Sequence, residues 1–86
     1  MYNVEISPTA LKALEKLKKH NKDVCKRVTA VIDNLRENPY NGKKLLGELS
    51  GLRSLRVADY RIIYTVIEKR ILVQVVKISH RREVYR

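Results

Sequence analysis

The sequence contains a single cysteine, Cys25, among its 86 residues. One cysteine excludes an internal disulfide framework and fits a reducing compartment, so we expect a cytoplasmic protein. One cysteine and two separated histidines provide no ligand cluster, so we expect no metal and no cofactor. The chain also lacks an apolar run long enough to span a membrane, and its first residues do not form a signal peptide. We therefore expect no membrane association.

Most sequence signatures of catalysis are also absent. There is no Gly-rich phosphate loop, no nucleophile elbow and no Cys–His pair close in sequence. His20 falls at the expected end of a helix in a lysine-rich stretch, where a solvated or capping role is expected. The candidates for chemistry are therefore the arginines, the tyrosines and His80.

Positive charge is abundant, with a formal net charge of +10 at pH 7. Such a charge on a small domain favours a nucleic acid or an acidic protein as the partner. Up to Leu52 the chain has ten Lys and Arg residues, eight of them lysine, whereas from Arg53 onward seven of nine are arginine. Because the planar guanidinium suits phosphate, we expect the ligand at the arginine-rich last third of the chain.

The length suits one small domain, which we expect to span residues 1–86. A short strand is expected at Tyr2–Ile6, followed by a helix that begins at Ser7-Pro8. A second helix is expected from about Asp23 to Glu37, because its apolar residues recur on one face. The short connection between the helices predicts an antiparallel pair.

The last third of the chain predicts a meander of three antiparallel strands. β-branched and aromatic residues favour strands at Leu52–Val57, Tyr60–Ile67 and Ile71–Ile78, joined by turns at Ala58-Asp59 and Glu68–Arg70. A helical crossover separates the first strand from the meander, so that strand is expected to join the sheet in parallel. The predicted fold class is α+β, with a two-helix antiparallel hairpin packed on a small, mainly antiparallel sheet in the order β-α-α-β-β-β.

Side-chain alternation divides the meander between two sheet faces. With two-residue hairpin turns, Val57 faces Tyr60 and Arg56 faces Arg61 across the ladder. One face is almost wholly apolar and is expected to lie beneath the helices. The other carries both arginines, and the same alternation assigns His80 to it. Two opposed arginines repel each other, so they either splay into solvent or converge on an anion such as phosphate.

The apolar stripes of the two helices and the apolar sheet face together predict the core. Cys25 falls on a helix stripe and is expected to act as a small buried hydrophobe. Six residues are expected at the centre of the core: Leu14, Val28, Val31, Ile62, Tyr64 and Val73.

The set formed by Arg56, Arg61, His80, Arg81 and Tyr85 is typical of a site that cleaves phosphodiester bonds. Attack by the 2′-hydroxyl of RNA requires a proton acceptor, a donor to the leaving oxygen and positive charge at the phosphorane. Arginines placed in advance supply that charge, and one such donor contributes about 10²–10³ in rate. His80 can exchange protons near neutrality, with a structural role as the alternative. No carboxylate accompanies His80 on its expected face, which argues against an ordinary His/Glu ribonuclease.

Two runs, Leu55–Tyr64 (LRVADYRIIY) and Val76–Tyr85 (VKISHRREVY), resemble the RelE/ParE toxin superfamily of bacterial and archaeal toxin–antitoxin systems. The helix start at Ser7-Pro8 and the helix end at Asn38-Pro39 agree, so the resemblance covers essentially the whole chain. It implies a microbial-ribonuclease-like fold and an acidic, RelB-like antitoxin, in a higher-order hetero-oligomer. In the RelE-like branch it implies a ribosome-dependent endoribonuclease (an mRNA interferase) that cleaves messenger RNA in the ribosomal A site.

The resemblance also implies roles by position. Arg61 matches an arginine that steadies the scissile phosphate, Arg81 one proposed to protonate the leaving group, and Tyr85 a tyrosine that positions the attacking nucleotide. These three are the expected catalytic residues, and the expected RNA-binding residues are Arg53, Arg56, His80 and Arg82. The sequence departs from the best-known RelE pattern, because Leu52 and Ser54 stand where lysines assist the attack. The general base therefore stays open among Lys43, Arg53, Arg56 and His80.

Two other functions stay open from the sequence. One is a ParE-like gyrase inhibitor, which uses the same scaffold without this active site. The other is a non-catalytic basic module that binds RNA or DNA, with an affinity that falls steeply with salt. The presence of both Arg81 and Tyr85 favours the ribonuclease.

Overall fold

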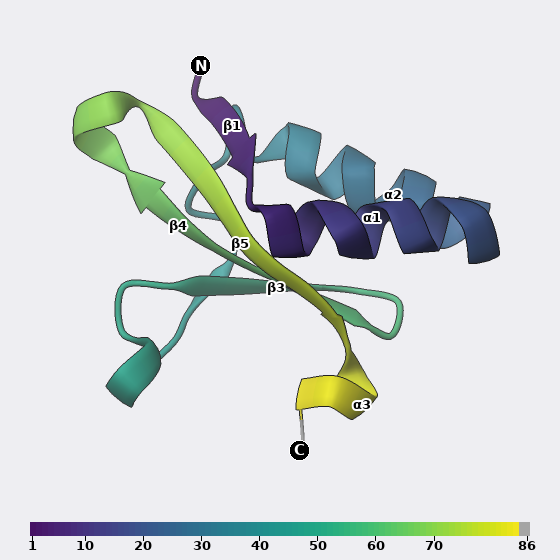
Figure 1. Cartoon of the computed structure of the whole chain (residues 1–86). Helices are drawn as coiled ribbons and strands as arrows, with labels where there is room; N and C mark the ends of the chain where they lie inside the picture. Colours follow the sequence, from purple (N-terminus) through teal and green to yellow (C-terminus); the bar gives the residue numbers. More distant parts are fainter. Residues whose placement is uncertain (85–86) are drawn as a thin grey trace.

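The strands of the chain form one mixed sheet in the order β1-β5-β4-β3-β2, shown in the computed structural model of Figure 1, which describes residues 1–84. The bounds of the strands are Asn3–Ile6 for β1, Lys43–Lys44 for β2, Arg53–Val57 for β3, Tyr60–Ile67 for β4 and Leu72–His80 for β5. β1 is parallel to β5, and the other neighbouring pairs are antiparallel. The predicted α+β class, the two-helix hairpin packed on a mainly antiparallel sheet and the parallel first strand are confirmed.

Two long helices, α1 (Pro8–His20) and α2 (Lys22–Asn34), lie side by side on one face of the sheet (Figure 1). The Ser7 side chain caps α1, as its position before a proline predicts. Asn21 serves both helices: its N–H donates to the Leu17 carbonyl at the end of α1, and its side-chain oxygen accepts from the N–H of Val24 in α2. One linking residue therefore reverses the chain and sets the antiparallel pair.

The sequence predicted only turns or a tail where the structure has three short helical elements. They are the 3₁₀ helices η1 (Gly47–Leu49) and η2 (Glu68–Arg70) and the single-turn helix α3 (Arg81–Val84). The two-residue strand β2 was also missed, since two lysines give no strand pattern. Within residues 1–84, no helix is long and apolar enough to cross a membrane.

The core lies between the helix pair and the sheet. Five of the six residues expected at its centre are buried: Leu14, Val28, Ile62, Tyr64 and Val73. Val31 is only partly buried and packs against the edge of this cluster, as does Cys25. The core prediction is therefore confirmed except for the depth of Val31.

The β3–β4 hairpin has the predicted register, with Val57 opposite Tyr60 and Arg56 opposite Arg61. A β-bulge interrupts the next pair. Ile63 pairs with Lys77 and Tyr64 with Val75, so that Val76 is the extra residue on β5. The Ser7 hydroxyl donates to the Val76 carbonyl at 2.6 Å and ties the bulge to the start of α1.

Because of the bulge, each side chain of β5 after Val76 lies on the sheet face opposite to the one that unbroken alternation predicts. Ile78 pairs with Ile62 and is buried under the helices, whereas Ser79 pairs with Arg61 on the opposite face. His80, opposite Tyr60, therefore lies on the helix side. The expected position of His80 beside the arginines is wrong, because unbroken alternation cannot account for one inserted residue.

Candidate active site

Polar and basic side chains gather on the sheet face turned away from α1 and α2. Ladder partners share a face, so two rows can be read from the register. One row runs Lys43, Ser54, Ile63, Lys77 across β2, β3, β4 and β5; the other runs Arg56, Arg61, Ser79 across β3, β4 and β5. The rows lie about 7 Å apart along the strands. We call these seven residues the arginine face.

The centre of the arginine face carries two guanidinium groups, those of Arg56 and Arg61. Arg56 is exposed and Arg61 is half-buried. Within residues 1–84, the carboxylates that approach an arginine to 4.0 Å or less pair with Arg36, Arg70 and Arg81, and none pairs with Arg56 or Arg61. Two like charges held opposite each other cost free energy unless an anion lies between them. The pair is therefore suited to bind a phosphate group.

Arg81 is the first residue of α3, directly after β5. Its N–H donates to the Asp59 carbonyl at 2.7 Å, and its guanidinium lies 4.0 Å from the Asp59 carboxylate. Both partners of this ion pair are largely exposed, so the pair itself contributes little stability. Arg82 is exposed. Tyr85, the third expected catalytic residue, lies outside the described residues.

His80 occupies a different environment from the one expected. Its ring meets the Tyr60 ring edge-on, with centroids 5.2 Å apart and planes at 90°. Its Nδ1 accepts a hydrogen bond from the Arg82 N–H at 3.2 Å. It lines a hollow of about 210 Å³, together with His20 and Leu17 of α1. His80 is therefore separated from the arginine face by the sheet itself, and the expected RNA contact is not supported.

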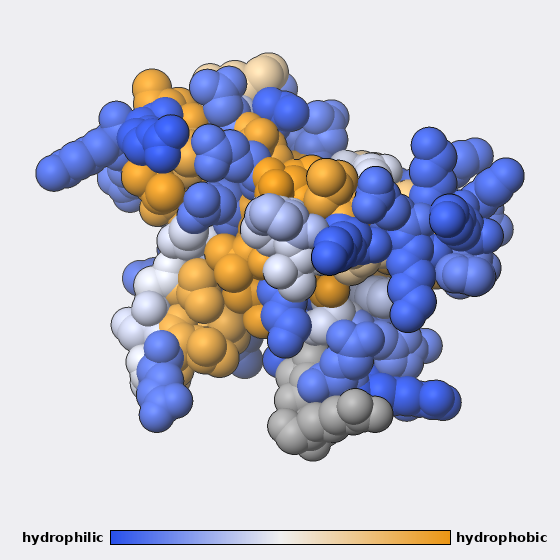
Figure 2. Space-filling model, in the orientation of Figure 1, coloured by the Kyte–Doolittle hydropathy of each residue, from blue (hydrophilic) through white to orange (hydrophobic). Residues whose placement is uncertain are grey.

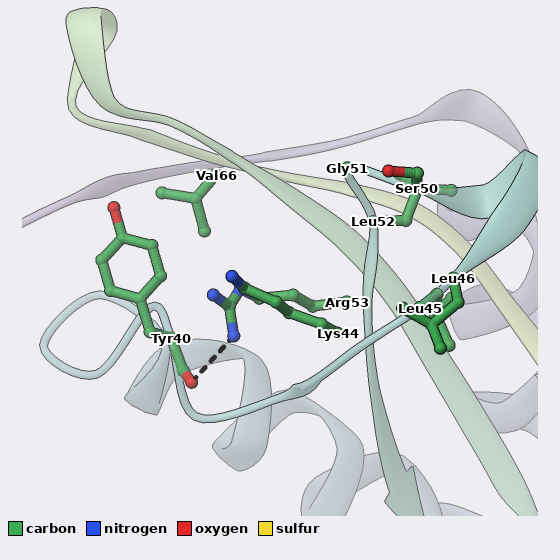
Figure 3. A pocket seen from close by; sticks show the side chains of 9 residues that line it. All are labelled: Tyr40, Lys44, Leu45, Leu46, Ser50, Gly51, Leu52, Arg53 and Val66. Carbon is green, nitrogen blue, oxygen red and sulfur yellow. Dashed lines mark hydrogen bonds between the residues drawn. The ribbon is translucent and has the colours of Figure 1, made fainter.

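Arg53 also lies away from the arginine face, because it pairs with Tyr64 and points to the helix side. Its Nη1 donates to the carbonyl oxygens of Gly42 at 2.9 Å and Tyr40 at 3.2 Å, the latter bond drawn in Figure 3. The guanidinium also stacks on the Tyr40 ring, 4.9 Å from its centroid. Alternation from Leu55 already assigns Arg53 to the apolar face, and this signal could have removed it from the RNA-binding set.

The hollow beside Arg53 has a volume of about 330 Å³ and mixes apolar and basic side chains (Figure 3). Tyr40 lies at one side, where its hydroxyl donates to the Glu68 carboxylate; this bond raises the pKa of Tyr40 above its usual value. The same segment exposes Leu46 and Leu49, and Figure 2 shows apolar surface beside η1 bordered by hydrophilic side chains. This hollow is on the helix side and does not belong to the arginine face.

Ser79 and Lys77 are members of the arginine face that the sequence did not identify. Ser79 is 2% exposed, and among the described residues its hydroxyl has no hydrogen-bond partner. The signal that could have found both is the pair Val75-Val76, two apolar neighbours that break strand alternation before Lys77-Ile78-Ser79. Such a break is the pattern that a bulge leaves in a sequence.

The arginine face can therefore stabilise negative charge, and its lysines can transfer protons. Arginine remains charged at all accessible pH values, whereas lysine can lose its proton. Within the described part of the chain, no group of three His, Cys, Asp or Glu residues could hold a metal ion. The residues present suit binding and cleavage of a phosphodiester by protein side chains.

Known proteins of similar sequence and structure are toxins of toxin–antitoxin systems. A family model described as the ParE toxin of the type II toxin–antitoxin system parDE matches residues 4–85. The chain is 35% identical to a Mycobacterium tuberculosis protein named Toxin RelE, over 99% of the chain and 87% of that relative. It is similar in structure to the isolated Escherichia coli RelE toxin (TM-score 0.80, 26% identity, 99% of this chain and 92% of the other). It is also similar to a chain of the archaeal RelE–RelB complex from Pyrococcus horikoshii (TM-score 0.78, 31% identity, 93% of this chain and 94% of the other).

Proposed function

The chain belongs to the RelE/ParE superfamily of toxin–antitoxin toxins, in its RelE-like branch, and we propose that it is a ribosome-dependent endoribonuclease that cleaves messenger RNA in the A site. The observation that carries the proposal is the Arg56–Arg61 pair on the arginine face, which no carboxylate of residues 1–84 compensates. Its substrate is RNA, which supplies its own nucleophile. We place its action in the cytoplasm, where ribosomes and messenger RNA are found.

In the proposed reaction the ribose 2′-hydroxyl attacks the adjacent phosphorus, and the bond to the 5′ oxygen of the next nucleotide breaks. The proton of the 2′-hydroxyl passes to a base and a proton reaches the leaving 5′ oxygen, which leaves a 2′,3′-cyclic phosphate. Arg61 stabilises the charge on the phosphorane, with Arg56 opposite it. Arg81 donates a hydrogen bond to the leaving oxygen, which takes its proton from water, and Tyr85 positions the attacking nucleotide.

The arrangement narrows the choice of general base. Of the four residues left open by the sequence, Arg53 and His80 lie on the helix side, whereas Lys43 and Arg56 lie on the arginine face. Because arginine does not release its proton, Lys43 is the proposed acceptor. Within residues 1–84 no carboxylate pairs with Lys43, so the ribosome must present the RNA in a reactive geometry.

The proposed partner besides the ribosome is an acidic antitoxin. Similar toxins have been solved as complexes with RelB-type antitoxins, including RelBE2 of Mycobacterium tuberculosis. A formal net charge of +10 favours an acidic partner, which would associate quickly at low salt and more slowly at high salt. We propose that such an antitoxin orders on binding, covers part of residues 81–86 and forms a higher-order hetero-oligomer with the toxin. Complexes in which this tail and the β3–β4 hairpin stay fully exposed would contradict that placement.

The test is cleavage of a messenger RNA on programmed ribosomes by the parent chain and by Arg61→Ala, Arg81→Ala and Tyr85→Phe. If these residues act in the transition state, each substitution lowers cleavage far more than ribosome binding. Neutralisation of Lys18 and Lys19, at the end of α1, serves as the control and should weaken association and flatten its salt dependence. Unchanged cleavage and growth arrest in all three variants would refute the assignment.

A second candidate is inhibition of DNA gyrase, which the match to the ParE family model supports. It is tested by supercoiling assays with purified gyrase and by mapping messenger RNA ends in cells that express the chain. Cuts at codon boundaries without loss of supercoiling favour the ribonuclease. DNA damage without cuts favours gyrase.

A further inference from the structure

The start of α3 is held by the last residue of β5 and by the turn between β3 and β4. The His80 Nδ1 accepts from the Arg82 N–H at 3.2 Å, and the Arg81 N–H donates to the Asp59 carbonyl at 2.7 Å. The His80 ring also rests edge-on against the Tyr60 ring. Two consecutive amides of the helix are thus bound by groups that precede it in the chain.

These contacts matter because α3 is a single turn of four residues. Helix nucleation in water is unfavourable. A helix of a single turn is therefore not stable without contacts to the rest of the protein. The first N–H groups of a helix have no partner within it, and Asp59 and His80 satisfy two of them here. The Arg81 side chain is 64% exposed, and within residues 1–84 its guanidinium has only a 4.0 Å ion pair to direct it. The direction of the Arg81 side chain therefore depends mainly on where its backbone is fixed.

The contacts of His80 also determine how far the backbone of Arg81 lies from that of Arg61. Tyr60 directly precedes Arg61 in β4, and His80 directly precedes Arg81. The pairing of Tyr60 with His80, by ladder register and by ring contact, sets the separation of the two arginine backbones. A displacement of about 1 Å at a reacting group can lower a rate about 10²-fold, so this separation is relevant to cleavage.

We propose that His80 is a positioning residue for Arg81. Its Nδ1 fixes the first turn of α3, its ring anchors that turn to Tyr60, and Arg81 is thereby held at the end of the arginine face. The inference rests on the proposed function, since it assigns Arg81 a role in cleavage. It gives a role in the site to a histidine that lies on the helix side, away from the arginine face.

Three substitutions separate the two contacts of His80. His80→Asn keeps a side-chain oxygen that can accept from the N–H two residues on, without the ring. His80→Phe keeps a ring against Tyr60 without the acceptor, and His80→Ala removes both. His20→Ala is the matched control, because His20 lines the same hollow and has no hydrogen bond to α3 within residues 1–84. Thermal melts verify that each variant is folded.

Cleavage on programmed ribosomes gives the first measurement. We expect His80→Phe to lower kcat about tenfold, the effect of one hydrogen bond, with KM unchanged. The kcat of His80→Asn should stay within about threefold of the parent value. His80→Ala should have the lowest kcat of the three His80 variants, and the kcat of His20→Ala should equal that of the parent. A raised KM with unchanged kcat in His80→Phe would instead mark His80 as an RNA contact and overturn the inference. Parent-like cleavage by His80→Ala would overturn it as well.

A second measurement separates this inference from the proposed function. Backbone chemical shifts and amide exchange of residues 81–84 are recorded by NMR for the free protein. Loss of helical shifts and faster Arg82 amide exchange in His80→Phe and His80→Ala, with recovery in His80→Asn, support positioning whether or not RNA is cleaved. Unaltered shifts in all three variants refute it. Absence of cleavage by the parent chain would refute only the proposed ribonuclease activity and the role of Arg81 in it. It would not refute the contact by which His80 fixes the start of α3.

Discussion

Replacement of Tyr64 by phenylalanine is expected to destabilise the protein. The Tyr64 hydroxyl accepts from the Gly42 N–H and donates to the Pro39 carbonyl, each at 2.8 Å, in a buried site. A phenylalanine leaves both backbone groups buried without a partner. At about 1 kcal/mol for each group, the low end of the usual range, the loss is about 2 kcal/mol. For a chain of this length, that lowers Tm by about 8–16 °C.

Urea and thermal unfolding of Tyr64→Phe measure this loss. Tyr60→Phe is the control, because the Tyr60 hydroxyl has no hydrogen bond within the described residues and removal of it leaves no buried group unsatisfied. Equal free energies of unfolding for the two variants would refute the reasoning. Addition of a methyl group at Gly42 gives an independent check: its Cβ would lie 2.6 Å from the Tyr64 hydroxyl, so Gly42→Ala should also destabilise.

Alkaline pH provides a further test of the same site. Burial raises the pKa of Tyr64 above its usual value of about 10. The unfolded chain therefore releases this proton at a lower pH than the folded chain does. The contribution of Tyr64 to stability is full below about pH 10 and is lost as the pH rises above it. Tyr64→Phe should lack this part of the alkaline loss of stability, measured by urea unfolding between about pH 9 and 11.

Three other changes have defined outcomes. Leu14→Ala should cost about 2–5 kcal/mol in urea unfolding, because Leu14 is buried between helix and sheet; a cost below about 1 kcal/mol would mean that the core can collapse around the gap. Ile71→Asn should raise the free energy of unfolding by about 1 kcal/mol in thermal melts, since this β-branched, 53% exposed residue has a left-handed φ of 49°; a loss of stability would contradict the strain. Arg61→Lys should rescue only part of the cleavage that Arg61→Ala loses, because an ammonium group lacks the planar fork, and full activity on programmed ribosomes would refute that role.

The parts of the fold that could be predicted from the sequence are those set by neighbouring residues. Ser7-Pro8 forms a local cap, and Ala58-Asp59 allows only one register between Val57 and Tyr60. Ala58 adopts a left-handed φ of 54° at this turn, which a two-residue hairpin loop requires. The opposition of Arg56 and Arg61 follows directly, so the centre of the arginine face was accessible from sequence alone.

The parts that were missed depend on distant contacts. The bulge at Val76 is fixed by the Ser7 hydroxyl, 69 residues earlier, and it decides the faces of Lys77, Ser79 and His80. Arg53 is held by the carbonyls of the 40–42 loop, whose position depends in turn on Tyr64. A local pattern such as the Val75-Val76 break can mark a bulge, but it does not identify the distant partner that fixes it. The misplacement of His80 was thus a consequence of one inserted residue and not of its chemistry.

The central claim is that the arginine face cleaves RNA through the 2′-hydroxyl of the substrate. It is tested most directly with ribosomes programmed by two messenger RNAs that differ only in the A-site codon, one all-ribose and one with 2′-deoxyribose. Because the attacking group is absent from the deoxy codon, we predict that the chain binds both complexes equally and cuts only the first, leaving a 2′,3′-cyclic phosphate. Equal cleavage of both codons, or binding to both without cleavage of either, would contradict the account.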